Sequence, residues 1–335
     1  MKGLIAAFFC VLQSFFDLYI KNLIFSIFTF LLFNSPVIAA NYAYITNQGA
    51  NNVSVLNLDT HEVLTKINVG HSPAGVVTSH NGQRVYVTNP DSRDISVIDT
   101  GTNSVIKTIP AGDGPVAIET SPDDRFIYVA DWYLNQISII DTHRLEIINT
   151  VSVGKSPSGI AVSNDGGFLF VANRDDDSLM IITTSDNKII KTIKLGDAPF
   201  GITLSSDGNF LYAANVRSGD ISILDLQKQQ IIKTIPVGNF PYAIVHDEKR
   251  NRLFVTNQRD SSVSVISLET FKVTHTIEVG EYPEGIAIHP SGHEIYVANW
   301  FDGNLSIINT YTLEVIGEIE TDEGSRAYGD FISIH

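Results

Sequence analysis

The feature that most constrains this chain is an internal repeat of constant length. Seven similar segments recur, AYITN, VYVTN, IYVAD, LFVAN, LYAAN, LFVTN and IYVAN, and their aromatic residues are Tyr44, Tyr86, Tyr128, Phe170, Tyr212, Phe254 and Tyr296. Successive aromatics are always 42 residues apart, and seven such units account for all 294 residues of the segment 42–335. The repeat therefore leaves no room for a second folded domain.

Each unit has the pattern of four short β-strands separated by turn residues. Between Pro115 and Gly154 the four segments are VAIET, FIYVAD, QISIID and EIINTVSV, which alternate apolar and polar residues and are rich in β-branched side chains. Four antiparallel strands in a unit of about 40 residues, repeated radially, are typical of a propeller blade. The sequence thus predicts an all-β fold, a seven-bladed β-propeller of four-stranded antiparallel blades.

The two ends of the repeat predict how the ring closes. The first unit begins at a second strand, Tyr42 to Asn47, and the chain ends in a segment that resembles an innermost strand. We therefore expect the seventh blade to take three strands from the N-terminal end and one from the C-terminal end. Closure of this kind pairs edges that would otherwise be open to aggregation.

Columns that stay constant between units indicate structural demands. The glycine that ends each outer strand is expected to adopt a positive φ, and a small residue near the start of each inner strand should allow close packing at the ring axis. The asparagine after each YVTN-like strand should cap the following loop backbone. These columns are Gly70, Gly112, Gly154, Gly196, Gly238 and Gly280; Gly75, Ala117, Gly159, Gly201, Ala243, Gly285 and Ala327; and Asn47, Asn89, Asp131, Asn173, Asn215, Asn257 and Asn299.

With these motifs the chain resembles the YVTN family of seven-bladed propeller repeat proteins. The resemblance rests on the YVTN or YVAN strand and on runs such as ISVID, IIKTIPVG and P-x-G-I-A-x-S-x-D-G, and it covers residues 42–335. It implies an extracytoplasmic binding or surface protein. The tail departs from the pattern, because Asp322 and Ser325 stand where glycine and proline are expected.

The first 40 residues are expected to direct export. A lysine precedes an apolar run over residues 23–33, which is followed by a small-residue site where cleavage after Ala39 or Ala40 is expected. An additional apolar stretch over residues 3–20 permits a second interpretation, an uncleaved membrane anchor. We therefore predict a signal peptide or N-terminal anchor in residues 1–40 and a propeller in residues 41–335, located in the periplasm or at the cell surface. Any membrane contact would be through an uncleaved leader.

Charge and residue usage exclude several classes of partner and site. The formal net charge is −15 and the longest basic run is Lys249-Arg250, which argues against a nucleic-acid partner. The single cysteine, Cys10, precedes the propeller, so no disulfide or thiolate zinc site is expected there. The histidines show no metal-ligand spacing, and the acidic run 175–177 reads as a solvated loop, so we predict no metal site.

The candidate ligand-binding residues belong to the loops after the asparagine column and to the connections between blades, which strand order places on one face. Positions that vary between units there carry large aromatic residues and arginines, a combination suited to a protein, glycan or small-molecule ligand. The competing interpretation is that these rings merely cover neighbouring blade edges. The candidates are Trp132, Tyr133, Arg174, Arg217, Tyr242, Arg259, Tyr282, Trp300, Phe301 and Arg326.

The sequence favours a monomeric binding or scaffold protein without a cofactor. It contains no G-x-S-x-G elbow, phosphate loop or H-E-x-x-H motif, so no catalytic residue is predicted. Two alternatives stay open. A propeller enzyme of the lactonase type needs convergent acidic groups, and Glu119 and Asp330 are the carboxylates well inside inner strands. A haem or electron-transfer accessory protein needs an axial histidine, which the aromatic face is not expected to supply.

Overall fold

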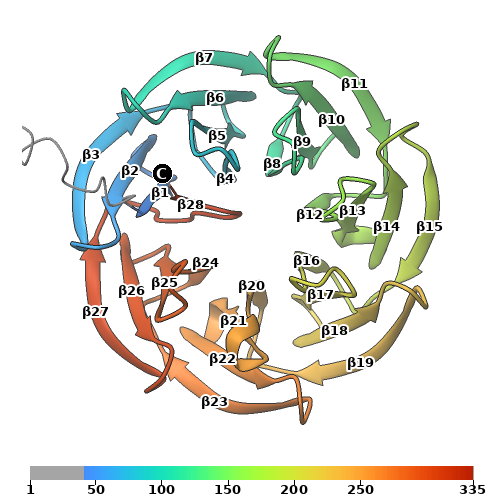
Figure 1. The fold of residues 1–335 in the computed structure, drawn as a ribbon, viewed down its shortest axis with the longest axis vertical. Coiled ribbons are helices and arrows are strands. Elements are labelled where there is room, and N and C mark those ends of the chain that lie inside the picture. Colours follow the sequence, from blue (N-terminus) through green and yellow to red (C-terminus); the bar gives the residue numbers. More distant parts are fainter. Residues whose placement is uncertain (1–40, 335) are drawn as a thin grey trace, which may run out of the picture. The chain divides into compact units, whose positions relative to one another are not determined.

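The computed structural model describes residues 41–334, which form a ring of seven four-stranded antiparallel sheets (Figure 1). The predicted fold class, an all-β seven-bladed propeller, is confirmed. The predicted signal peptide or anchor in residues 1–40 lies outside the described residues. Among residues 41–334 there is no helix long and apolar enough to cross a membrane.

The blades are numbered along the chain and their strands are given from the axis outward. Blade 1 has β4 (Val76–Thr78), β5 (Arg84–Asn89), β6 (Asp94–Asp99) and β7 (Ser104–Pro110); blade 2 has β8 (Pro115–Thr120), β9 (Phe126–Asp131), β10 (Gln136–Asp141) and β11 (Glu146–Ser152). Blade 3 has β12 (Pro157–Val162), β13 (Phe168–Asn173), β14 (Ser178–Thr183) and β15 (Ile189–Lys194); blade 4 has β16 (Pro199–Leu204), β17 (Phe210–Asn215), β18 (Asp220–Asp225) and β19 (Gln230–Pro236). Blade 5 has β20 (Pro241–Asp247), β21 (Arg252–Asn257), β22 (Ser262–Ser267) and β23 (Lys272–Glu278); blade 6 has β24 (Pro283–Ile288), β25 (Glu294–Asn299), β26 (Asn304–Asn309) and β27 (Glu314–Glu320). Blade 7 has β28 (Ile332–Ile334), β1 (Asn41–Asn47), β2 (Asn52–Asn57) and β3 (Glu62–Asn68), and single 3₁₀ turns occupy Arg174–Asp176, Glu248–Arg250 and Gln258–Asp260.

The hydrophobic core lies between neighbouring blades and contains the repeated aromatic of each second strand. Tyr44, Phe254 and Tyr296 are at most 1% exposed, and the other four members of this column are at most 3% exposed. Burying a side chain of this size stabilises the fold by about 1.5–3 kcal/mol. The 42-residue period therefore reflects one large buried aromatic side chain in each blade.

The ring closes as predicted, in blade 7. Strand β28 pairs antiparallel with β1, with Ile332 opposite Ala43, and the Tyr44 amide donates to the Phe331 carbonyl over 2.9 Å. The tail also bonds to blade 1, which the repeat pattern does not predict. The amides of Val76 and Thr78 donate to the carbonyls of Tyr328 and Asp330 over 2.9 and 3.0 Å. Residues 326–334 thus join two blades at the closure point.

The small residues of the inner strands are required by close backbone approach, as predicted. A Cβ added at Gly75, Gly159, Gly201 or Gly285 would lie 2.0–2.2 Å from a backbone carbonyl oxygen of the neighbouring inner segment. Real side chains do not tolerate such a distance. At these four positions the inner segments therefore pack backbone against backbone, and the other three positions of the column carry the small side chain of alanine.

The explanation predicted for the outer-strand glycines is wrong in most blades. Gly112 has φ +81°, but Gly154 and its other equivalents do not have positive φ. A Cβ at Gly154 would instead lie 2.6 Å from Cγ of Asn173, so the glycine makes room for the asparagine column. Positive φ falls two residues later, at Ser72, Ser156, Ala198, Phe240 and Tyr282.

The asparagine column does not cap the following loop backbone as predicted, because its side chains bond to side chains of the next strand. The Asn299 amide donates to Asn304 Oδ1 over 2.8 Å and to Ser306 Oγ over 2.9 Å, so it ties two neighbouring strands together. The predicted loop capping is made by Asp131, whose carboxylate accepts the amides of Tyr133 and Leu134 over 3.1 and 2.9 Å. An amide Nδ2 suits side-chain acceptors on the next strand, whereas a carboxylate can only accept and therefore binds backbone N–H groups.

Deleting residues 325–335 is expected to lower the melting temperature of the whole ring by about 10 °C or more, because the closing strand and the bonds to blade 1 are lost together. Circular dichroism melts of the full-length and truncated proteins measure the difference. Lys107→Thr, at an exposed residue of the outer strand β7, serves as the control and should melt like the wild type. An unchanged melting temperature for the truncated protein would show that closure does not hold the ring.

Candidate functional site

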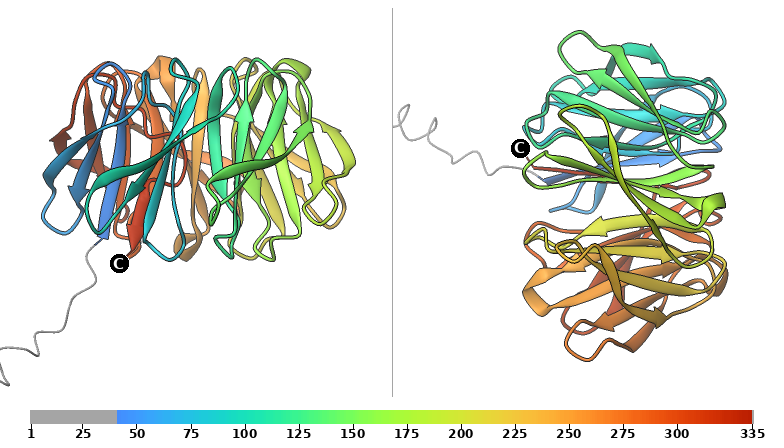
Figure 2. Two further views of the ribbon diagram at one scale, coloured as in Figure 1. Left: turned by 90° about the horizontal axis from the view of Figure 1, so that it is seen from above. Right: turned by 90° about the vertical axis from the view of Figure 1, so that its right-hand side faces the viewer.

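The ring presents two different faces, because each strand crosses its thickness and the connections gather on either side (Figure 2). The loop face carries the loops after the asparagine column and the connections between blades. The turn face carries the turns that follow the inner strands, such as those at His80, Pro122 and Asn164. The ten predicted residues belong to the loop face or lie directly beneath it, and the structure divides them into separate groups.

One group consists of three aromatic residues at the loop-face end of blade 6. The ring centroid of Tyr282 lies 5.8 Å from that of Trp300 and 5.1 Å from that of Phe301, and the last two are 4.6 Å apart. The Trp300 Nε1–H donates to Gln48 Oε1 over 2.9 Å, which fixes the indole against blade 7. Phe301 remains 62% exposed. Two rings of this group therefore position a third that faces solvent.

A second group pairs Trp132 with Arg174. The Arg174 guanidinium carbon lies 5.6 Å from the Trp132 ring centroid, and the Phe200 ring centroid lies 6.1 Å from the indole. Both residues are half-buried. A cation over an indole face is a favourable contact within the protein itself, so this pair is largely occupied by its own partners.

Three of the candidates stand apart on the loop face. Tyr133 is 70% exposed, and Arg217 and Arg259 are also exposed. The Arg259 guanidinium carbon lies 3.6 Å from the ring centroid of Phe240, an inter-blade loop residue. The structure therefore does not bring the ten residues into one pocket. It spreads aromatic and basic groups over the loop face.

The last two candidates, Tyr242 and Arg326, lie largely buried at the ring axis. Arg326 Nη2 donates to the Tyr242 hydroxyl over 2.6 Å, and Arg326 Nε lies 2.8 Å from Glu284 Oε2. Glu284 Oε1 accepts from Gln258 Nε2 over 2.9 Å. Burial raises the pKa of Glu284, against the opposing charge of Arg326. The contact between Arg326 Nε and Glu284 is a close ion pair rather than a well-aligned hydrogen bond.

An aromatic plug, made of Phe200, Tyr242 and Tyr328, closes the axis below the loop face. Phe200 stacks on Tyr242 at 4.2 Å between centroids, and Tyr328 packs edge-on against them at 5.2 and 5.5 Å. None of the three is more than 7% exposed. Tyr242 is thus part of the plug, and Arg326 is bound to it and to Glu284, so neither side chain is freely available on the surface.

Beneath this plug the centre of the ring is a blind channel of about 510 Å³. Its walls carry one isoleucine from each of five inner strands, spaced 42 residues apart: Ile118, Ile160, Ile202, Ile244 and Ile286. The lining ends at Tyr328 toward the plug and reaches the turn face at His80, Pro122 and Asn164. This volume lies within the range typical of small-molecule sites.

Two carboxyl groups, Glu119 and Asp330, line the channel. Burial, and then the charge of Asp330, raise the pKa of Glu119 to about 8. Burial also raises the pKa of Asp330, against the influence of His80. The Asp330 side chain is accessible from within the channel. The channel walls nevertheless keep most bulk water away from it, and loss of this hydration disfavours the charged form and raises the pKa. At neutral pH the pair therefore holds a proton.

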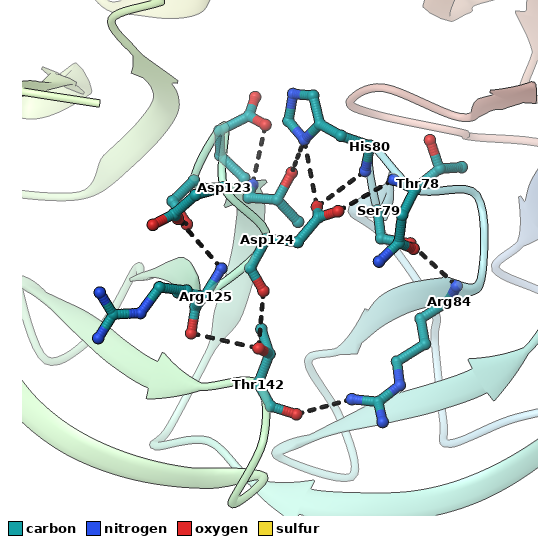
Figure 3. A network of polar contacts seen from close by, with 12 residues as sticks. Thr78, Ser79, His80, Arg84, Asp123, Asp124, Arg125 and Thr142 are labelled. Atoms are coloured by element: carbon teal, nitrogen blue, oxygen red, sulfur yellow. Dashed lines mark hydrogen bonds and ion pairs between the residues drawn. The ribbon is translucent and has the colours of Figure 1, made fainter. Parts of the chain in front are cut away.

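His80 stands at the mouth of the channel and connects blades 1 and 2 (Figure 3). Its backbone amide donates to Asp124 Oδ1 over 2.8 Å, and its Nδ1 lies 3.3 Å from the same oxygen and from Thr120 Oγ1. The Asp124 carboxylate also accepts the Asn81 amide over 2.9 Å. The His80 side chain is 54% exposed. The structure places His80 beside the channel carboxyls.

Histidine and metal chemistry can be judged on the described part of the chain. Within residues 41–334, no group of three or more His, Cys, Asp or Glu side chains is arranged to hold a metal ion. His71 is exposed in the connection between blades 7 and 1, next to Ser92 on the loop face. The loop face therefore carries a histidine, in the Gly-x-x-Pro connection of residues 70–73.

Comparison with protein families supports the propeller repeat. Residues 78–166 and 107–209 match the family described as YNCE-like beta-propeller. Residues 191–276 match the family described as lactonase, 7-bladed beta-propeller. Each match covers part of the ring. No curated protein matches the chain in sequence.

Solved structures share the fold at low sequence identity. A Kuenenia stuttgartiensis hydrazine synthase is 21% identical with a TM-score of 0.74, covering 80% of this chain and 92% of that chain. A functionally unknown protein from Desulfotomaculum acetoxidans DSM 771 is 19% identical with a TM-score of 0.77, covering 88% and 98%. The dihydro-heme d1 dehydrogenase NirN in complex with DHE is 15% identical with a TM-score of 0.68, covering 88% and 75%. The molecule is thus a seven-bladed propeller, and these similarities concern its fold.

The channel carboxyls predict a pH dependence of stability. A folded-state pKa of about 8 for Glu119 means that the folded protein binds this proton more tightly than the unfolded chain does. The free energy of unfolding should therefore decrease as the pH rises from about 4.5 to 8. Glu119→Gln removes this contribution and should be more stable than the wild type at pH 8.5, by on the order of 2 kcal/mol, but not at pH 5.

Urea denaturation at the two pH values measures this difference. Glu281→Gln, at an exposed glutamate of the loop face, is the matched control and should show the same stability difference from the wild type at both pH values. If Glu119→Gln behaves like this control, the channel does not raise the pKa of Glu119.

Proposed function

We propose that the protein is an exported binding or scaffold protein that uses its loop face to bind a protein, a glycan or a small ligand. The observation that carries this proposal is the pair of highly exposed aromatic rings, Tyr133 at 70% and Phe301 at 62%, on a face built from loops of a rigid ring. Exposed aromatic side chains supply a large contact area with little loss of conformational entropy on binding. The proposed location, periplasm or cell surface, rests on residues 1–40 and on the resemblance to YVTN repeats.

The architecture supports a binding role for this face. Loops held at both ends by paired strands keep their side chains in fixed relative positions, so binding costs little ordering. At blade 6 the Trp300 indole is hydrogen-bonded to Gln48 and packs against the Phe301 ring. Arg217 and Arg259 add exposed donors on blades 4 and 5. Aromatic contact area with arginines nearby is typical of residues that dominate protein interfaces.

Site-specific crosslinking tests this proposal even though the partner is unidentified. A photoreactive phenylalanine analogue placed at Tyr133 or Phe301 should yield a defined crosslinked species on the intact cell envelope, because these rings would lie in the interface. Gel mobility and mass spectrometry of the purified adducts measure the result.

Tyr311 is the matched control, since it is 64% exposed but lies in a turn on the opposite face. The same analogue at Tyr311 should give no such species. Adducts from Tyr311 but not from Tyr133 or Phe301 would move the binding surface to the turn face and refute the proposed site.

A propeller enzyme of the lactonase type is a second candidate. The match of residues 191–276 and the carboxyl pair in the channel favour it. However, the matched segment lines the channel only with residues 201–204 and 243–245, whereas Glu119, Asp330 and His80 lie outside it. The match therefore reflects the repeat more than an acid–base pair. Lactone turnover that is lost in Glu119→Gln would favour this function over binding.

A haem or electron-transfer role has less support. The hydrazine synthase and NirN share the fold at 21% and 15% identity, and a similarity at this level does not indicate that this chain binds the same ligand. His71 is a histidine on the loop face, but it is exposed, and its backbone amide is bound to Ser92. A Soret band in the spectrum of the purified protein would be needed to favour this role.

A further inference from the structure

We propose that the blind central channel is a second binding site, which takes a small organic cation with an apolar body, such as a primary amine bearing an alkyl or aryl group. This site is distinct from the loop face, since the aromatic plug separates the two. It would be reached from the turn face, through the mouth at His80.

The charge of the channel selects the sign of the ligand. Its lining contains Glu119, Asp330 and His80, and no lysine or arginine is among the described residues that form it. Arg326, which donates to Tyr242 of the plug, is already paired with Glu284 at 2.8 Å. The Asp330 charge destabilises ionised Glu119. A cation between two such carboxyls relieves their repulsion, whereas an anion increases it.

The repeat pattern shows that this charge is a local departure from the propeller scaffold. Residues equivalent to Glu119 in the next four blades are Ala161, Thr203, Val245 and Ala287. An enclosed glutamate at a column that is otherwise small or apolar does not serve blade packing. Burying a carboxyl without an opposite charge is costly, so a ligand is the simplest reason for its presence.

The walls select the rest of the ligand. Five isoleucines form the sides of the channel, and the Tyr328 ring, which occupies the same column in the tail, forms its closed end. Such walls stabilise an apolar body through burial but offer few donors for a polyhydroxylated one. A bare metal ion fits poorly, because no group of three or more metal-ligating side chains was found among residues 41–334.

The whole-molecule charge favours the same class of ligand. A net charge of −15 attracts cations toward the ring and concentrates them near an acidic opening. His80 stands at that opening and is held by Asp124 and Thr120, so it can line the path without blocking it.

Calorimetric titration of the mature protein at pH 8 with 2-phenylethylamine tests the proposal. We expect saturable binding that weakens about ten-fold or more in Glu119→Gln and in Asp330→Asn, as for loss of one charge partner in an enclosed site. The neutral analogue 2-phenylethanol should bind the wild type at least about ten-fold more weakly and should not distinguish the variants. Glu281→Gln, with an exposed carboxyl, is the matched control and should bind the amine like the wild type.

Thr203→Phe provides a test that does not depend on charge. Thr203 lines the channel, so a phenyl ring there should occupy the space of the ligand body and abolish amine binding while the circular dichroism spectrum stays unchanged. The proposal is overturned if 3-phenylpropionate binds as tightly as the amine, if amine binding survives both carboxyl substitutions, or if no binding of the amine is detected up to 10 mM, roughly the weakest affinity that such a pocket would give.

Discussion

The backbone-to-backbone approach of the inner strands is the constraint on which the rest of the structure depends. At Gly75, Gly159, Gly201 and Gly285 the neighbouring carbonyl oxygen leaves no room for a Cβ, and the remaining three blades have alanine in this column. The repeated aromatics then fill the widening space between blades. Identical unit length follows from this geometry, because each blade must present its inner strand at the same depth. The narrow axis also accounts for the channel, whose walls are the side chains that follow each small residue.

The last residues of the chain both close the ring and contribute side chains to the central channel. Strand β28 completes blade 7, while the preceding segment bonds to blade 1 through the Val76 and Thr78 amides. The same segment supplies Tyr328 to the aromatic plug, Arg326 as the partner of Tyr242 and Glu284, and Asp330 to the channel. The tail thus places a carboxyl group, Asp330, at a channel position where blades 6, 4 and 3 have Ile288, Leu204 and Val162. Stability of the ring and occupancy of the channel are therefore expected to be coupled, since a ligand that binds only the closed ring stabilises it.

The fold was predictable because a constant period, four strand patterns and the two chain ends leave one solution. The site was less predictable. The repeat pattern assigns Trp132 and Tyr242 to loops of the same face. Tyr242 instead lies at the axis and stacks on Phe200, and this position depends on packing between blades, which the repeat pattern does not show. The contact of His80 with Asp124 joins residues 44 positions apart in neighbouring blades, and no local pattern signals it. Glu119 and Asp330 were both recognisable from the sequence as carboxylates inside inner strands, but their location in one channel depends on how the tail packs against blade 1.

The most direct test of this account is the thermal stability of Gly201→Val beside that of Gly101→Val. A Cβ at Gly201 would lie 2.2 Å from the Tyr242 carbonyl oxygen, whereas at Gly101 the nearest atom is 3.5 Å away in an open turn. If inner strands must touch through their backbones, Gly201→Val should lose several kcal/mol of stability or fail to melt cooperatively, and Gly101→Val should lose about 1 kcal/mol or less. Equal melting temperatures for the two variants would contradict the account.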